Sequence, residues 1–535
     1  MVGGPLKTTR ELVRGALILS IASLIVKVLS AAYRIPYQNI AGDIGFYIYQ
    51  QVYPFYGIVL TLSTVGFPAV ISKLLAERND SEEGFSTNEI LMSSLVILGA
   101  LGIVMFGGLF FFADLIAAVM GDPQLTGLLK IIAFSFLLMP ATSVIRGYYQ
   151  GQGNMIPTAL SQVFEQLIRV ATILLLSLFL IRHGSSLYEA GTGAVFGSIT
   201  GGGTGLFILL GFIILRKEWL NLKEAPLEFR NFPFIMKALI FQGFSFCMTG
   251  LILVLIQLVD SLQLYNLLRE VGLGATEAKE WKGVYDRGQP LIQLGTVIAT
   301  SLSLTMIPII SFAMKKGDKE ELVNKISLTL KVSASVGVAA SSGLICLIKP
   351  VNIMLFTDMK GSGTLAILAV SILFTSVIMA QSAILQSMGY TWAPVVVVGF
   401  GLVCKWSLNR LLVPHYSITG AAVATVLSFV LMALLLAIFL QTKVSMPLFE
   451  KNSVYIIIGA TVTMVVTLMV YNQLFQLFQL SGRSISSVQA LTGASLGGIL
   501  FIYSILKTGL FTKNELLLLP LGEKLVTYLH KEEYQ

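Results

Sequence analysis

A polar stripe that begins just after Pro157 carries the side chains of this sequence that are best suited to chemistry. Ser161, Glu165 and Arg169 follow one another at i, i+4 spacing, and a glutamine stands next to each of the first two. On a helix, these side chains fall within an arc of about 140° on one face. An ionised side chain costs roughly 3 kcal/mol or more at the centre of a membrane helix. We therefore expect Glu165 and Arg169 to face each other, other helices or water rather than lipid. They act as one pair, which either cements helix packing or lines an aqueous cavity.

A second polar stripe runs along the first apolar segment, residues 12–33. Three serines, Lys27 and Arg34 share one face of this segment, within an arc of about 80°. Arg34 lies at the end of the segment, where a long basic side chain can extend to the membrane interface, whereas Lys27 lies about two turns deeper. A cavity suits Lys27 better than lipid does. Both residues are candidates for the lining of a cavity.

The cysteines and histidines form no catalytic or metal-binding set. Cys247, Cys346 and Cys404 lie far apart in apolar segments, without CxxC spacing, and the chain has only three histidines. This pattern argues against a metal site and against a disulfide framework. A nucleophile, a base and an orienting group cannot be assembled from these residues. We therefore expect a protein that is not an enzyme and has no cofactor, and we leave open coupling to an ion gradient or to the membrane potential.

The composition indicates a polytopic membrane protein. Of the 535 residues, 55% are hydrophobic and 12% are charged, and the mean hydropathy is +0.82. A soluble chain of this length would be far more polar. The net charge of +8 comes from basic residues in short loops between apolar runs, which is typical of membrane topology. No basic tract with interleaved aromatic residues occurs, so we expect no nucleic-acid partner.

Apolar segments of the roughly 20 residues that a bilayer-spanning helix needs recur along the chain. They lie at residues 12–33, 47–77, 88–112, 125–147, 157–181, 191–215, 238–260, 284–313, 323–348, 363–387, 392–412, 418–441, 453–475 and 488–507. A basic loop separates the first six from the second six. The sequence therefore predicts an all-α fold of about 14 transmembrane helices, with two pseudo-symmetric six-helix lobes and two C-terminal helices.

The corresponding domains are an N-lobe (residues 1–225), a C-lobe (226–445), a pair of spans (446–510) and a tail (511–535). In the tail, an apolar stretch between charged residues is typical of an interfacial helix on the cytoplasmic surface. If the N-terminus is cytoplasmic, 21 basic residues fall in inner segments and ten in outer segments. This excess predicts that both termini lie inside the cell.

The two lobes echo each other in their glycine and proline positions. Gly66 and Pro68 in the second span correspond to Pro308 in the eighth, and the Gln-x-x-Gly before Pro157 corresponds to the one before Pro394. The two offsets are 240 and 237 residues, which favours duplication over chance. Proline removes a backbone hydrogen bond and bends a membrane helix. The candidate hinges of an alternating-access transporter are therefore Gly66, Pro68, Pro157 and Pro308, unless they form static kinks.

Here the sequence resembles a known family. The runs GDIGFYIYQQVYPFYGIVLTLSTVGFPAVISKLLAE and RGYYQGQGNMIPTALSQVFEQLIRV are similar to those of the polysaccharide-transport branch of the multidrug, oligosaccharidyl-lipid and polysaccharide (MOP) exporter superfamily. Within it, the chain resembles the stage V sporulation protein B group of Gram-positive bacteria, relatives of the lipid II flippases. The resemblance covers essentially the whole length, including the division into six, six and two spans.

The resemblance implies a flippase in the bacterial cell membrane. Its substrate would be a polyprenyl-pyrophosphate-linked glycan, such as a peptidoglycan or polysaccharide precursor, moved from the inner to the outer leaflet by rocking of the two lobes. Arginine and lysine bind pyrophosphate through charge-assisted hydrogen bonds. Lys27 and Arg34 match the placement of the basic residues on helix 1 of lipid II flippases, whereas helix 2 has no basic residue before Lys73. Besides the glycolipid and membrane lipids we expect no partner, and we expect a monomer.

Two alternatives belong to other classes. A multidrug or cation antiporter of the same superfamily typically has twelve spans and an acidic cavity, and a scaffold for wall synthesis would transport nothing.

Asp260, at the end of the seventh span, matches Arg34 in the repeat and is a further candidate binding residue. Most embedded charges of the sequence are basic: Lys27, Arg34, Arg169, Lys331 and Lys405, against the acidic Glu165 and Asp260. This balance favours an anionic substrate.

Overall fold

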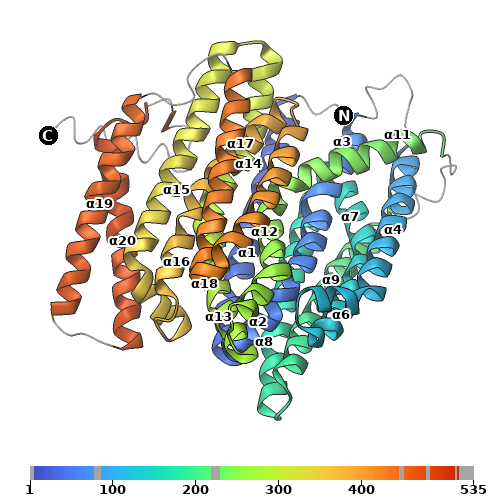
Figure 1. The fold of residues 1–535 in the computed structure, drawn as a ribbon. Helices are drawn as coiled ribbons and strands as arrows, with labels where there is room; N and C mark the ends of the chain where they lie inside the picture. The colour runs from blue at the N-terminus through green and yellow to red at the C-terminus, as the bar shows by residue number, and fades with distance from the viewer. Residues whose placement is uncertain are drawn as a thin grey trace. The chain divides into compact units, whose positions relative to one another are not determined.

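The structure is a computed structural model, shown in Figure 1. It describes residues 5–77, 86–218, 229–444, 451–477, 482–512 and 515–516. All regular elements in these ranges are helices. Most of the predicted interfacial tail and part of the basic loop between the lobes lie outside the described residues.

The described residues form two compact units. One lies within Met1–Pro290 and Pro394–Ala421, and the other within Leu291–Ala393 and Ala422–Gln535. The first unit holds α1 (Pro5–Ala32), α2 (Arg34–Thr61), η1 (Leu62–Gly66), α3 (Phe67–Glu77), α4 (Thr87–Phe111), α5 (Ala113–Val119), η2 (Pro123–Leu125), α6 (Thr126–Ala133), α7 (Ser135–Gly151), α8 (Ile156–Arg182), α9 (Leu187–Leu215), α11 (Phe232–Lys237), η3 (Ala238–Gly243), α12 (Phe244–Glu270) and α13 (Ala275–Asp286).

The second unit holds α15 (Lys319–Phe356), α16 (Ser362–Ala369), α17 (Ser371–Ser387), α19 (Lys451–Leu477) and α20 (Arg483–Lys507). Two helices have residues in both units, α14 (Gly288–Lys316) and α18 (Trp392–Lys443). In the second unit, α15 packs against α19 and α20, and Leu347, Met464, Leu468 and Phe501 contribute to their common core.

Eleven helical segments of the described chain are long and apolar enough to cross a membrane. Two of them bend inside. The first, Ile18–Glu77, turns at Gly42, whose φ of 68° suits only a residue without a side chain, and α18 turns at Ser417. Divided at these bends, and together with the long helix α14, they make about fourteen crossing segments. The predicted all-helical polytopic fold is confirmed.

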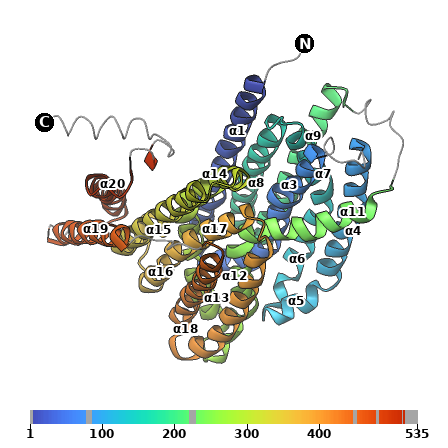
Figure 2. The same ribbon diagram turned by 90° about the horizontal axis from the view of Figure 1, so that it is seen from above.

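Close contact between α8 and α9 positions the polar stripe that starts after Pro157. Glycines on α9 allow this approach, which is visible in Figure 2. A Cβ at Gly201 would lie only 2.7 Å from the carbonyl oxygen of Glu165 and 2.8 Å from the Cβ of Arg169. A Cβ at Gly205 would lie 2.9 Å from Oε2 of Glu165. The polar face of α8 is therefore covered by the backbone of its neighbour.

The candidate hinge residues occupy different settings. Gly66 ends the π-helical turn η1, and Pro68 follows it in the first turn of α3. Pro157 stands in the first turn of α8, where proline is tolerated because no intrahelical bond is lost. Pro308 lies inside α14, whose helix is continuous. Their hinge roles stay predictions.

Gly66 also marks a crossing of helices. It packs on α12, where an added Cβ would overlap Sγ of Cys247 and lie 2.9 Å from the carbonyl oxygen of Gly243. Gly243 itself ends the second π-helical turn, η3. Two π-helical turns therefore meet at residues too small to keep the backbones apart.

We expect Gly66→Ala to lower the thermal unfolding temperature of the purified protein, because overpacking a close helix contact costs about 1–3 kcal/mol. Changing Cys247→Ala in the same chain should restore part of the loss, since Sγ is the overlapping atom. Gly99→Ala in α4, where an added Cβ meets no atom within 4 Å, is the matched control and should not destabilise. An unchanged unfolding temperature for Gly66→Ala would contradict the close crossing.

Candidate functional site

Buried basic side chains locate the candidate site, because a charged group inside an apolar protein needs a partner. In the described part of the chain, those less than a tenth exposed are Arg34, Arg146, Arg169, Lys282, Arg287, Lys331 and Lys405. Five have a carboxylate partner: Arg146 with Glu165 at 2.6 Å, Lys282 with Asp286, Arg287 with Asp43 and Lys405 with Asp260 at 2.7 Å each, and Lys331 with Glu515 at 3.6 Å. Arg34 and Arg169 make no ion pair with any described carboxylate.

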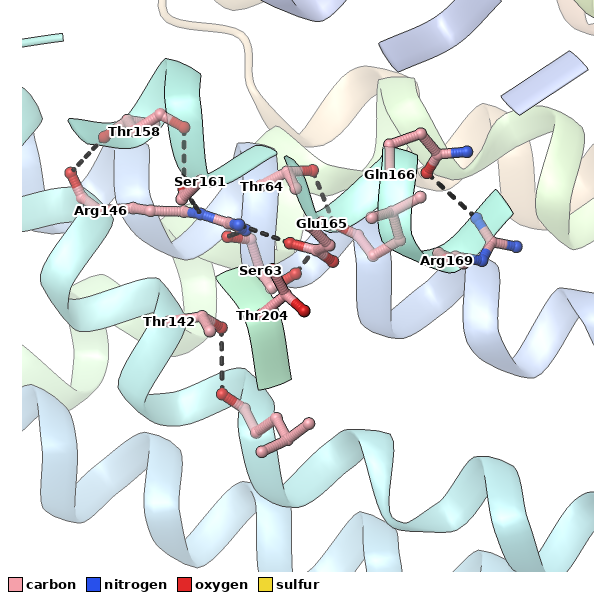
Figure 3. A network of polar contacts seen from close by, with 12 residues as sticks. Ser63, Thr64, Thr142, Arg146, Thr158, Ser161, Glu165, Gln166, Arg169 and Thr204 are labelled. Atoms are coloured by element: carbon pink, nitrogen blue, oxygen red, sulfur yellow. Dashed lines mark hydrogen bonds and ion pairs between the residues drawn. The ribbon is translucent and has the colours of Figure 1, made fainter. Parts of the chain in front are cut away.

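Glu165 binds Arg146 of α7 and not Arg169 of its own helix, so the predicted Glu165–Arg169 pair is wrong. Arg146 Nη2 donates to Glu165 Oε2 at 2.6 Å, and Arg146 Nε donates to Ser161 Oγ at 3.1 Å. Figure 3 shows Arg146 reaching Glu165 while Arg169 turns away toward Gln166. The i, i+4 spacing permits a pair on α8 but does not reveal that α7 brings a second guanidinium to the same carboxylate.

Arg146 is not among the predicted site residues; in the sequence it lies at the end of the fourth span and counts among the 21 basic residues of the inner segments. The structure buries it completely inside α7, and its Nη1 donates to the carbonyl oxygen of Ser63 in η1 at 3.2 Å. The four-residue spacing of Gly147 and Gly151 is a signal that could have shown this. Both glycines pack against side chains of α3, so the helix must continue past Arg146.

Arg169 lies among tyrosines. Its Nη2 donates to the hydroxyl of Tyr33 at 3.1 Å and to that of Tyr49 at 3.0 Å, and these two hydroxyls bond to each other at 2.7 Å. The guanidinium carbon stands 4.1 Å from the ring centre of Tyr56 and 5.7 Å from that of Tyr53. Arg169 is thus oriented by neutral groups alone.

Arg34 opens α2 and is also completely buried. Its guanidinium carbon stands 4.1 Å from the ring centre of Tyr53, and none of its three nitrogens has a hydrogen-bond partner. A buried guanidinium with unused donors favours binding of water or an anion. We call the aromatic surround of the two arginines the tyrosine box; its members are Tyr33, Tyr37, Tyr49, Tyr53 and Tyr56. These tyrosines are not among the predicted site residues, although Tyr33 and Tyr37, like Tyr49 and Tyr53, are four residues apart.

The other predicted binding residues lie elsewhere. Lys27 is half-buried on α1 and has no hydrogen bond or ion pair among the described residues. Asp260 is neutralised: it accepts from Lys405 at 2.7 Å, from Asn409 at 3.0 Å and from the Tyr285 hydroxyl at 2.8 Å. The structure therefore brings Arg34 and Arg169 together at Tyr53, whereas Glu165 and Asp260 pair with other basic residues.

The short helix α13 ties distant parts of the first unit together. Arg287, directly after α13, binds both carboxylate oxygens of Asp43 at 2.7 Å. Lys279 on α13 lies 3.1 Å from Asp122, at the turn between α5 and η2. Next to these pairs, Gly283 packs on the backbone of Asp43 so closely that a Cβ would overlap its carbonyl oxygen. We call the pairs Asp43–Arg287 and Asp122–Lys279 the α13 clamp.

Removing one partner of the Arg146–Glu165 pair should destabilise the protein by about 3–5 kcal/mol, because a buried charge stays behind. We expect Arg146→Gln and Glu165→Gln each to lower the unfolding temperature, and the double variant to lose less than the sum. The control combines Glu165→Gln with Arg169→Gln, and there the loss of stability in the double variant should equal the sum of the two single losses. Additive losses for the first pair, measured by thermal unfolding in detergent, would contradict the assigned partner.

Comparison with known proteins agrees with this architecture. A family model described as polysaccharide biosynthesis protein matches residues 12–314. The chain is 43% identical over 524 residues to the uncharacterized membrane protein YabM of Bacillus subtilis (strain 168). The matched residues make up 97% of each chain. It is 26% identical to the lipid II flippase MurJ of the same bacterium, over 94% of this chain and 96% of that one. Stage V sporulation protein B is 25% identical, over 79% and 82%.

Solved structures show the same fold. The lipid II flippase MurJ in an inward closed conformation superposes with a TM-score of 0.65 at 16% identity, covering 92% of this chain and 97% of that one. An inward-facing multidrug resistance MATE family transporter of the MOP superfamily gives 0.62 at 17% identity, covering 80% and 98%. The protein is thus a multi-pass membrane protein with the fold of MOP transporters. The chain belongs to the polysaccharide biosynthesis protein family.

Proposed function

We propose that the protein flips a lipid-linked glycan, carried on a polyprenyl diphosphate, from the inner to the outer leaflet of the bacterial cell membrane by alternating access. The observation that carries the proposal is the pair of fully buried arginines without a carboxylate partner, Arg34 and Arg169. Diphosphate is a strong acceptor of charge-assisted hydrogen bonds, and guanidinium groups match its geometry. The relative that is named as a lipid II flippase supports the same class of substrate.

The buried charges disfavour the cation antiporter. A cation site needs a carboxylate that is free to bind the cation, yet Glu165 is held by Arg146 and Asp260 by Lys405. Arg34 and Arg169, which the tyrosine box surrounds, make no ion pair with a described carboxylate, so two positive charges stay uncompensated there. An anion is the better ligand for such a site.

The α13 clamp supports alternating access. In the predicted topology, with both termini in the cytoplasm, the start of α2 and the whole of α13 lie on the outer side. The clamp joins a segment of the predicted N-lobe to one of the predicted C-lobe through two ion pairs. We propose that this is the closed outer gate and that outward release of the substrate breaks both pairs.

Arg34→Ala should reduce translocation roughly 10- to 100-fold, because charge-assisted hydrogen bonds to phosphate contribute about 1.5–3 kcal/mol each. Arg34→Lys should retain part of the activity, since it keeps the charge but not the planar fork. The measurement is the transfer of a polyprenyl-diphosphate-linked disaccharide across proteoliposomes at matched protein content. Arg182→Ala, an exposed change at the end of α8, is the control. Full activity of Arg34→Ala would contradict the proposal.

Locking the α13 clamp should stop translocation. In a chain without the native cysteines, Asp122→Cys and Lys279→Cys place two thiols on opposite sides of the gate, and a short reducible thiol cross-linker can join them. We expect transfer to stop on cross-linking and to return on reduction, while each single-cysteine variant is insensitive. Continued transfer in the locked protein would show that the gate does not open at α13.

A further inference from the structure

We propose that the tyrosine box substitutes for the substrate anion while the site is empty, and that Tyr53 is a positioning residue whose ring competes with diphosphate for Arg34. This inference rests on the proposed function and adds to it the group that sets the affinity of the site. In the bound state Arg34 would leave the face of Tyr53 and donate to the phosphate oxygens.

The geometry around Tyr53 supports this role. The guanidinium carbon of Arg34 lies over the ring of Tyr53, 4.1 Å from its centre, and the guanidinium carbon of Arg169 lies 5.7 Å from the same centre. Both arginines are completely buried. The negative face of an aromatic ring attracts a cation, so the two guanidinium groups share one weak neutral partner.

The choice of partner separates these arginines from the other buried cations of the described chain. Arg146, Lys282, Arg287, Lys331 and Lys405 are each committed to a carboxylate. Breaking such a buried pair lowers the equilibrium constant for folding by roughly 10²-fold or more, whereas losing a desolvated cation–π contact lowers it by about 30-fold. A ring can therefore hold a guanidinium in the empty site and still release it to a phosphate.

The two arginines are held to different degrees. Arg169 has three hydrogen bonds, to Tyr33, Tyr49 and Gln166, besides its ring contacts. Arg34 lies over the ring of Tyr53, and none of its three nitrogens has a hydrogen-bond partner. Arg169 is thus the fixed member of the site, and Arg34 is the member that an arriving anion can draw away from Tyr53.

Binding of farnesyl diphosphate to the purified full-length protein in detergent tests the inference at constant ionic strength. Tyr53→Leu removes the competing ring, so we expect the dissociation constant to fall roughly 5- to 30-fold and the empty protein to unfold at a lower temperature. Tyr53→Phe keeps the ring face and should bind as the wild type does. Inorganic diphosphate measured alongside separates recognition of the headgroup from recognition of the lipid.

Tyr47→Leu is the matched control. Tyr47 is buried on the same helix, and its ring packs on Tyr265 with no guanidinium over it in the described structure. Its loss should lower stability without changing the affinity for farnesyl diphosphate. If Tyr53→Leu does not fold, Tyr53→Met replaces it, because this change also removes the ring that lies 4.1 Å from the guanidinium carbon of Arg34.

The outcomes separate the two proposals. The diphosphate site is supported if the wild type binds farnesyl diphosphate and Arg34→Ala weakens this binding at least tenfold. If Tyr53→Leu then binds as the wild type does or more weakly, the role of the ring is overturned and the diphosphate site is retained. A weaker affinity in Tyr53→Phe as well would place the hydroxyl on the substrate and also overturn it. Wild-type protein that does not bind farnesyl diphosphate, or binds it independently of Arg34, overturns the diphosphate site and the inference with it.

Discussion

The burial of charge in an apolar protein governs how this molecule is built. A carboxylate or guanidinium removed from water requires a partner, and the need is greatest where lipid surrounds the protein. Arg146 and Glu165 join α7 to α8, and Lys405 joins α18 to Asp260 of α12. The first pair joins consecutive helices, whereas the second joins helices that are far apart in the chain. Electrostatic pairing therefore helps to select which polar faces meet.

Small residues make this pairing possible. The polar face of α8 is covered by α9 only because Gly201 and Gly205 have no side chains. The close packing leaves the side chain of Glu165 only slightly exposed, which strengthens its interaction with Arg146. The packing of the helices and the electrostatics of the site are therefore two results of the same glycine positions.

The fold could be predicted from the sequence far better than the site. Long apolar segments have few structural solutions in a membrane, so their number and helical form follow from composition and length. Arg34 and Arg169 were recognisable because a charge inside an apolar run stands out. The partner of Glu165 was not, because i, i+4 spacing reports on one helix only and Arg146 comes from another. The tyrosine box was also missed, since tyrosine is common near membrane interfaces and its spacing is equally compatible with ordinary packing.

The π-helical turn η1 changes the side-chain periodicity along the second predicted span. A π turn accommodates one residue more than an α turn, and each residue of an α-helix advances the side chains by about 100°. The face of α2 that carries Tyr53 and Tyr56 therefore does not continue along α3 at the usual periodicity. Removal of a single residue between Leu62 and Gly66 would restore the regular period, yet it would rotate every side chain of α3 relative to the arginines. The extra residue of this turn thus sets the rotation of α3 relative to α2, so that the two helices present their side chains to different neighbours.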